Sequence, residues 1–232
     1  MRDPGRLAAL AAEIRDCRAC AEDFARTPTA HPPRPILRPS TTARLCIASQ
    51  APGWRAHRSG RPFDDPSGVR LRDWMGLDEE TFWDDRRVAI LPMAFCFPGH
   101  DGRAKGGGGG GGRSLGGDLP PPRRCAALWR DRLFEAHGAA PVDGGSGGFD
   151  LVLLVGGYAQ AWHLGDAARR RSLAETAADW RAHLARGLFP MPHPSWRNTA
   201  WLKRHPWFEA EAVPELRRRV AALLAVSPVD AP

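Results

Sequence analysis

The sequence predicts an α/β fold with three layers, α/β/α, around a central, mostly parallel four-stranded sheet. Four short apolar runs fit buried strands, at residues 45–48, 88–96, 150–157 and 188–191. Segments with apolar residues at helical spacing separate these runs. Strands that alternate with helices along a chain are typical of a parallel sheet with helices on both faces.

The length and composition fit one globular domain. A chain of 232 residues can bury one sizeable core, so we expect a single domain over residues 1–226. Seven consecutive glycines at 106–112 cannot pack a core. They predict a mobile insert at about 99–122, and we expect a disordered tail at 227–232.

The charge of the chain allows a nucleic-acid partner, and its hydropathy argues against a membrane protein. The net charge of +7 is compatible with a polyanion partner such as nucleic acid, and equally with arginine used for solubility. No apolar run approaches the roughly 18 residues needed to cross a bilayer, and the first residues lack the apolar core of a signal peptide. We therefore expect a cytoplasmic protein with no membrane partner, whose five cysteines are metal ligands, catalytic or buried rather than disulfide-bonded. We also expect a monomer.

The first helix leads into a pair of cysteines. Apolar residues recur at helical spacing over residues 6–16, which predicts a helix with one packed face. Cys17 and Cys20 follow it, close enough in sequence to share one metal ion or cluster. A thioredoxin-like motif has the opposite order, with the cysteines at the start of a helix that follows a strand.

The first strand, residues 45–48, leads into the loop on which we centre the predicted site. The loop opens with residues 49–53, Ser-Gln-Ala-Pro-Gly, and continues through residues 60–67. Asp65 and Pro66 predict a helix start there, as N-cap and first helical residue. Ligands of parallel α/β sheets sit outside the carboxyl ends of the strands, so this loop is a candidate site.

The later elements follow the same reasoning. Pro92 is an irregularity that we expect at the end of the second strand or at a bulge. Cys125 lies on the next predicted helix. Ser172 and Glu175 fit a capping box that opens a helix running to about residue 184. A last helix is expected from Pro214.

The loops at 49–67, 96–100 and 192–198 follow strands, so their tips should meet at one edge of the sheet. The side chains that we expect in one pocket there are Gln50, Phe63, Asp64, Asp65 and His193. Each also has a structural interpretation: Asp65 as an N-cap, Phe63 as core and His193 as an ordinary loop histidine.

Four cysteines form a second candidate site. Cys17, Cys20, Cys96 and Cys125 are the four thiolates that a structural zinc ion or an iron–sulfur cluster requires. Cys46 lies within the first strand and is expected in the core.

The order of these motifs resembles the uracil-DNA glycosylase superfamily, and most closely its iron–sulfur branch. The motifs in order are C-x-x-C, Q-A-P-G after a strand, G-R-P-F, a strand with cysteine, a helix with cysteine, G-G-Y-A and H-P-S. The resemblance covers about residues 7 to 225. It implies DNA as partner and a base-excision repair hydrolase that flips a deaminated base, most commonly uracil, out of DNA and cleaves its N-glycosidic bond.

The resemblance also implies roles for residues in the pocket. The loop residues Gln50, Ala51, Pro52 and Gly53 would approach the flipped base and the DNA backbone. Phe63 would stack on the base, and His193 would stabilise the departing base anion.

Further residues follow from the same resemblance. Ser195, Trp196 and Arg197 would enter the DNA groove. The four cysteines would hold a 4Fe–4S cluster, with zinc as the alternative.

The chain departs from the family pattern where relatives carry acids. Ala51 stands where the best-studied relatives have Asp, and Gln50 stands where the iron–sulfur branch usually has Glu. The base-reading Asn of relatives would align near Leu91 or Pro92. Asp64 or Asp65 is then the candidate substitute carboxylate, beside Gln50 and His193.

Three other functions stay open. The protein is alternatively a DNA-damage-binding relative without turnover, or one that captures the sugar covalently through the loop around His100, Arg103 and Lys105. A small-molecule, nucleotide-handling α/β enzyme is the third alternative, and it predicts no affinity for DNA at physiological salt.

Overall fold

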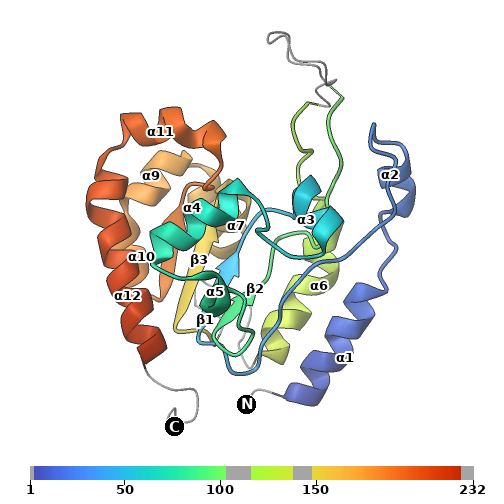
Figure 1. Ribbon diagram of the computed structural model, residues 1–232, viewed down its shortest axis with the longest axis horizontal. Helices are drawn as coiled ribbons and strands as arrows, with labels where there is room; N and C mark the ends of the chain where they lie inside the picture. The colour runs from blue at the N-terminus through green and yellow to red at the C-terminus, as the bar shows by residue number, and fades with distance from the viewer. Residues whose placement is uncertain (1–2, 103–115, 138–147, 226–232) are drawn as a thin grey trace.

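The computed structural model describes residues 3–102, 116–137 and 148–225 and has the predicted three layers (Figure 1). The sheet comprises β1 (Leu45–Ala48), β2 (Val88–Ile90), β3 (Leu151–Val155) and β4 (Leu188–Met191). Its order is β2-β1-β3-β4 and every neighbouring pair is parallel. Of the insert predicted at about 99–122, residues 103–115 lie outside the described residues, as does the tail at 227–232, whereas residues 99–102 and 116–122 are described and include a bridge between His100 and Asp118.

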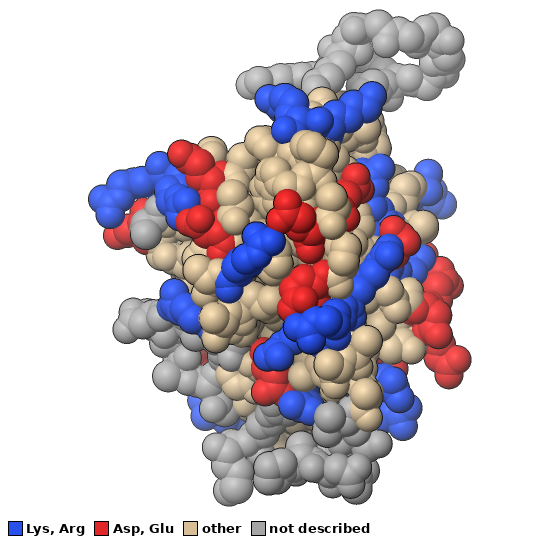
Figure 2. Space-filling model, turned by 90° about the vertical axis from the view of Figure 1, so that its left-hand side faces the viewer, with Lys and Arg blue, Asp and Glu red and all other residues tan. Residues whose placement is uncertain are grey.

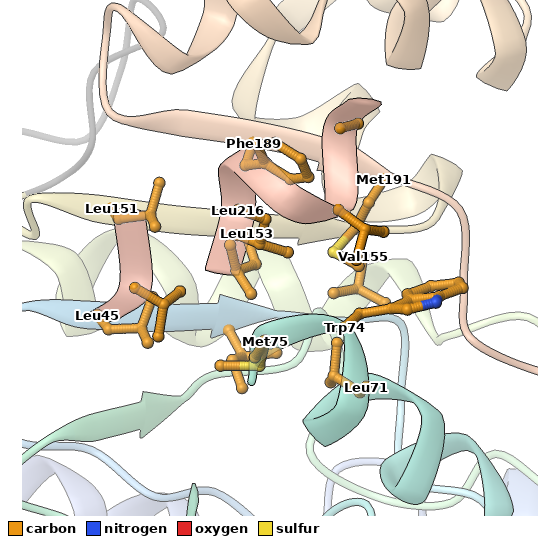
Figure 3. Close-up of a cluster of buried hydrophobic side chains, with 14 of the residues drawn as sticks. Leu45, Leu71, Trp74, Met75, Leu151, Leu153, Val155, Phe189, Met191 and Leu216 are labelled. Carbon is orange, nitrogen blue, oxygen red and sulfur yellow. The ribbon is translucent and has the colours of Figure 1, made fainter. Parts of the chain in front are cut away.

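Helices cover both faces of the sheet. Alternate strand residues, such as Leu45, Leu153 and Met191, pack against α4 (Pro66–Met75) and α12 (Val213–Ala225) (Figure 3). The strand residues between them pack against α1 (Pro4–Arg15) and α6 (Arg123–Ala136), which lie side by side. Because each strand is buried on both faces, its sequence is almost entirely apolar.

Shorter elements connect these layers. They are α2 (Ala21–Ala25), α3 (Trp54–Ser59), α5 (Glu79–Phe82), α7 (Gly157–His163), α8 (Gly165–Arg169), α9 (Leu173–Ala178), α10 (Trp180–Leu184), a 3-10 turn at Trp196–Asn198, α11 (Thr199–Arg204) and a π-helical turn at Phe208–Ala212.

Local capping signals are confirmed. The Asp65 carboxylate accepts the Gly68 N–H at 2.9 Å, and Pro66 opens α4. Ser172 and Glu175 form the predicted capping box of α9. Cys46 is fully buried in β1, as expected.

Element lengths were less well predicted. The second strand ends at Ile90, not near residue 96, because Pro92 cannot donate to a ladder. The helix expected to run to residue 184 is two helices, α9 and α10, separated at Asp179. Helix α3 lies in a stretch that the sequence presents as a loop, since Gly and charged residues hide its short pattern.

The strand order places a crevice beside β1. The chain runs from β1 to β2 on one side, and β3 joins β1 on the other side. Loops that leave neighbouring strands in opposite directions open a crevice at their carboxyl ends, where α/β proteins bind ligands.

Charges on the side of the molecule where α12 lies are mixed in sign (Figure 2). Arg181 pairs with Glu211, and Arg217 pairs with Asp73. The positive net charge is therefore not gathered on this side. None of the helices in the described part of the chain combines the length and the apolar character of a membrane-spanning segment.

A buried arginine supports the segment after β2. Arg130 of α6 is fully buried and donates through Nη1 to the carbonyl oxygens of Leu91 and Pro92, each at 2.9 Å. Its Nη2 lies 2.9 Å from Nε2 of His163. Burial lowers the pKa of Arg130 to about 10 and lowers that of His163 well below its ordinary value. The neutral His163 ring can therefore accept the hydrogen bond from the arginine.

Arg130→Ala is expected to lower the free energy of unfolding by about 3 kcal/mol, because two buried carbonyl groups lose a charged donor. Arg132→Ala on the same helix is the control. Arg132 forms an exposed ion pair with Glu13, so its removal should change stability much less. Urea unfolding measures both, and equal losses would contradict the supporting role of Arg130.

Candidate functional site

A cavity of about 570 Å³ opens at the carboxyl ends of the strands. Its lining residues are Ser49, Gln50, Ala51, Pro52, Gly53, Trp54, Arg55, Pro62, Phe63, Asp65, Pro66, Ser67, Pro92, Pro98, His100, Asp118, Leu119, His193, Ser195, Trp196, Arg197 and Asn198. The structure thus brings together every predicted pocket and DNA-contacting residue except Asp64.

The loop after β1 is held from behind by the segment after β2. The N–H groups of Met93 and Ala94 donate to the carbonyl oxygens of Ser49 and Gln50, at 2.8 and 3.1 Å. These bonds extend the β1–β2 contact beyond the last paired strand residues. They leave the side chain of Gln50 on the cavity wall, where its amide offers one donor group and one acceptor group.

Phe63 belongs both to the core and to the cavity wall. Its φ of 59° is left-handed, which is uncommon for a residue with a side chain. Its ring lies at 27° to the ring of His193, with centroids 6.5 Å apart, and meets Phe82 edge-on. Gly68 allows this arrangement, because a Cβ at that position would lie 1.8 Å from the Phe63 carbonyl oxygen.

The two adjacent aspartates differ in position. Asp65 caps α4 through one carboxylate oxygen and also lines the cavity. Asp64 does not line it. Of the two candidate substitute carboxylates, only Asp65 therefore reaches the site.

His193 is a neutral hydrogen-bond donor. The N–H of Ser195 donates to its Nδ1 at 3.2 Å, so the ring proton is on Nε2. Burial lowers the pKa of His193 below its ordinary 6.5; Asp65 raises it and Arg197 lowers it. The side-chain amide of Asn198 donates to the His193 carbonyl oxygen at 2.7 Å and holds the loop in place.

An exposed aromatic side chain stands beside the cavity. Ser195 accepts the Arg197 N–H through its hydroxyl oxygen at 3.3 Å and so starts the 3-10 turn. Trp196 is the first residue of this turn and is 71% exposed, although it also lines the cavity. A large apolar side chain so exposed at a cavity rim is suited to contact a ligand.

Asp118 is a cavity residue that the sequence did not reveal. His100 and Asp118 pair in an antiparallel bridge. Two backbone hydrogen bonds extend this pairing: the Leu119 N–H donates to the Gly99 carbonyl oxygen, and the Asp101 N–H donates to the Gly117 carbonyl oxygen. The local sequence does not predict that the segments 99–101 and 117–119 pair, because the segment between them is low in complexity. The position of His100, in a loop after a strand, could have indicated that it lies at the site. Asp118 follows no strand, so its position gave no such indication.

A family model described as Uracil DNA glycosylase superfamily matches residues 37–217. This is well over half of the chain. The chain belongs to the uracil DNA glycosylase superfamily. Members of the superfamily act on DNA, and membership assigns a glycosylase-like, hydrolytic function in general. The match includes Cys96 and Cys125 but begins after Cys17 and Cys20.

The four predicted metal-binding cysteines line a second, small cavity between α1, α2 and α6, apart from the first. Burial, with a smaller contribution from neighbouring cysteines, raises the pKa of Cys96 to about 12 and that of Cys125 to about 11. Over residues 3–102, 116–137 and 148–225, no three His, Cys, Asp or Glu side chains stand close enough together to hold one metal ion.

Gly68→Ala is expected to lower the free energy of unfolding by about 2 kcal/mol, because the new methyl group overlaps the Phe63 carbonyl and displaces it. Gly157→Ala is the matched control, since a Cβ there meets nothing within 4 Å. Denaturant unfolding of both variants tests the difference. Equal stability would show that Gly68 does not hold Phe63 in place.

Proposed function

We propose that this protein removes a deaminated base, with uracil as the first candidate, from DNA by hydrolysing its N-glycosidic bond. The observation that carries the proposal is the pairing of Phe63 with a neutral His193 in one cavity at the carboxyl edge of the sheet. Membership in the superfamily supports the reaction type. The choice of uracil rests on the resemblance of the motifs.

The two rings suit the two needs of the leaving base. Phe63 offers an aromatic face on which an extruded base can stack. Cleavage leaves negative charge on the base, and the Nε2–H of His193 is a donor that can stabilise it. Gln50 adds an amide that can hydrogen-bond the edge of the base. Ala51, Pro52 and Gly53 form the rest of this wall.

The exposed turn after His193 suits DNA entry. Rotating a base out of a duplex costs roughly a few kcal/mol. Trp196 can fill the vacated stack from the cavity rim, and the neighbouring Arg197 supplies positive charge toward the phosphate backbone. Ser195 fixes the turn that presents both side chains.

We propose that the four cysteines that line the second cavity hold a 4Fe–4S cluster. Each ionised thiol raises the pKa of its neighbours, so four thiolates need a positively charged partner. A cluster places each thiolate on a different iron, so its ligands stand farther apart than the four ligands of one zinc ion. Zinc is the alternative. Either group would join Cys17 and Cys20 to Cys96 and Cys125, and a zinc ion would require the four thiols to stand closer together than they do in this structure.

A second candidate function is covalent capture of the sugar by His100. The observation in its favour is that His100 lines the same cavity. Arg103 and Lys105, the other residues of that loop, lie outside the described residues. Capture would leave a protein–DNA adduct that survives SDS, whereas excision releases free base.

His193→Ala is expected to slow base release about 100-fold or more, because one donor to the developing anion is lost. Single-turnover assays on oligonucleotides with uracil, hypoxanthine or xanthine, single- and double-stranded, measure this rate. His183→Ala on α10 is the control, since His183 does not line the cavity.

The same assays separate the alternatives. Free base supports the glycosylase, and an SDS-stable adduct supports capture. Salt-dependent DNA binding without either product supports a damage-binding protein. Absence of DNA binding at physiological salt would favour a small-molecule enzyme.

The cluster proposal predicts a brown protein that absorbs in the visible and contains iron and acid-labile sulfide. Cys96→Ala should remove the colour and the iron. Cys46→Ala should retain both, because Cys46 is buried in β1 away from the second cavity. A colourless wild-type protein that contains zinc would contradict the cluster and support the alternative.

A further inference from the structure

Residues 49–53, which open the loop after β1, contain no acid, although the proposed reaction needs one. Gln50 and Ala51, which line the cavity there, are both uncharged. Breaking an N-glycosidic bond leaves positive character on the sugar, and the attacking water must lose a proton. A carboxylate on the cavity wall meets both needs. Among the described residues that line the cavity, Asp65 and Asp118 are the acidic ones.

Both carboxylates approach the loop at the same place. A methyl group at Gly53 would lie 3.6 Å from Oδ2 of Asp118 and 3.8 Å from Oδ2 of Asp65. Asp65 already uses its other oxygen to cap α4. That bond holds the carboxylate against the helix start. Asp118 does not cap a helix, so its carboxylate is the more available of the two for contact with a substrate.

His100 lies beside the Asp118 carboxylate. Its Nδ1 is 3.2 Å from Oδ1 of Asp118, at ion-pair distance but without hydrogen-bond geometry, and Oδ2 lies on the side of Gly53. The His100 side chain is only 15% exposed and packs edge-on against Phe97, whereas the Asp118 side chain is 40% exposed. A largely covered ring thus lies against a carboxylate that is open to the cavity. The antiparallel pairing of the two segments keeps both residues in register.

We propose that Asp118 is the catalytic carboxylate of this protein and that His100 is its positioning residue. The inference rests on the proposed glycosylase function. The bond between C1′ and the base nitrogen breaks, and its electron pair leaves with the base. The oxygen of water bonds to C1′, and the proton that this water loses passes to Asp118 and then to solvent. The base anion, held by His193, takes a proton from solvent.

The charges around Asp118 make its role dependent on pH. Burial raises the pKa of Asp118; His100 and Arg197 lower it, and Asp65 raises it. The carboxylate is the active form, so the rate should fall as pH drops through the pKa of Asp118. Without His100, the pKa of Asp118 should rise and the acid limb should move to higher pH.

The test compares single-turnover base release by the wild type and by Asp118→Asn. We expect a loss of about 100-fold or more, in the range of general-base catalysis, with binding of the same DNA retained. Asp101→Asn is the matched control. Asp101 lies at the base of the same loop, where its carboxylate accepts the Gly117 N–H, and it does not line the cavity. Its rate should stay within about twofold.

His100→Gln tests the positioning role through the pH profile. We expect the acid limb of the rate to shift to higher pH. A merely structural role would lower the rate at every pH and leave the limb in place, which would overturn the role of His100.

The outcomes separate the two levels of the hypothesis. Base release by the wild type together with an equally active Asp118→Asn overturns this inference and leaves the glycosylase function standing, as does a larger loss in Asp65→Asn than in Asp118→Asn. A wild type that releases no base overturns both. An SDS-stable adduct that His100→Gln abolishes also overturns the inference, because His100 would then be the nucleophile.

Discussion

The site depends on which hydrogen-bond partners the buried backbone N–H and carbonyl groups find where β2 ends. Pro92 stops the ladder, and buried polar groups beyond it still need partners. The N–H groups of Met93 and Ala94 find them on the β1 loop, and Arg130 supplies donors to the carbonyl groups of Leu91 and Pro92. Helix α6 therefore supports the cavity wall from below. The same helix begins beside Cys125, so one element connects the two candidate sites.

The cavity combines residues from segments far apart in sequence. Phe63 lies after α3, the helix that follows β1, and His193 lies after β4. Their rings nevertheless lie at only 27° to each other in the wall of the cavity. The strained backbone of Phe63 and the missing side chain of Gly68 are two parts of this one arrangement. Strain of this kind persists where the surroundings hold it, and it is common at functional sites.

Local signals predicted most of the fold. Apolar runs gave the four strands, and the N-cap at Asp65 and the capping box at Ser172 are short-range patterns that depend on neighbours in sequence. Strand and helix lengths were less predictable, because Pro92 and Asp179 end their elements through backbone hydrogen bonding that the apolar pattern does not register. The motifs also indicated the superfamily, which the family match confirms.

The sequence by itself determined the layers, the parallel sheet and the strand-end loops that hold Gln50, Phe63 and His193, because periodicity and turn residues act locally. Only the tertiary structure decided which carboxyl groups reach the cavity. Asp65 faces it and its neighbour Asp64 does not, since the start of α4 sets their directions. Asp118 enters through pairing with the segment at His100, a contact between distant segments that no local pattern encodes.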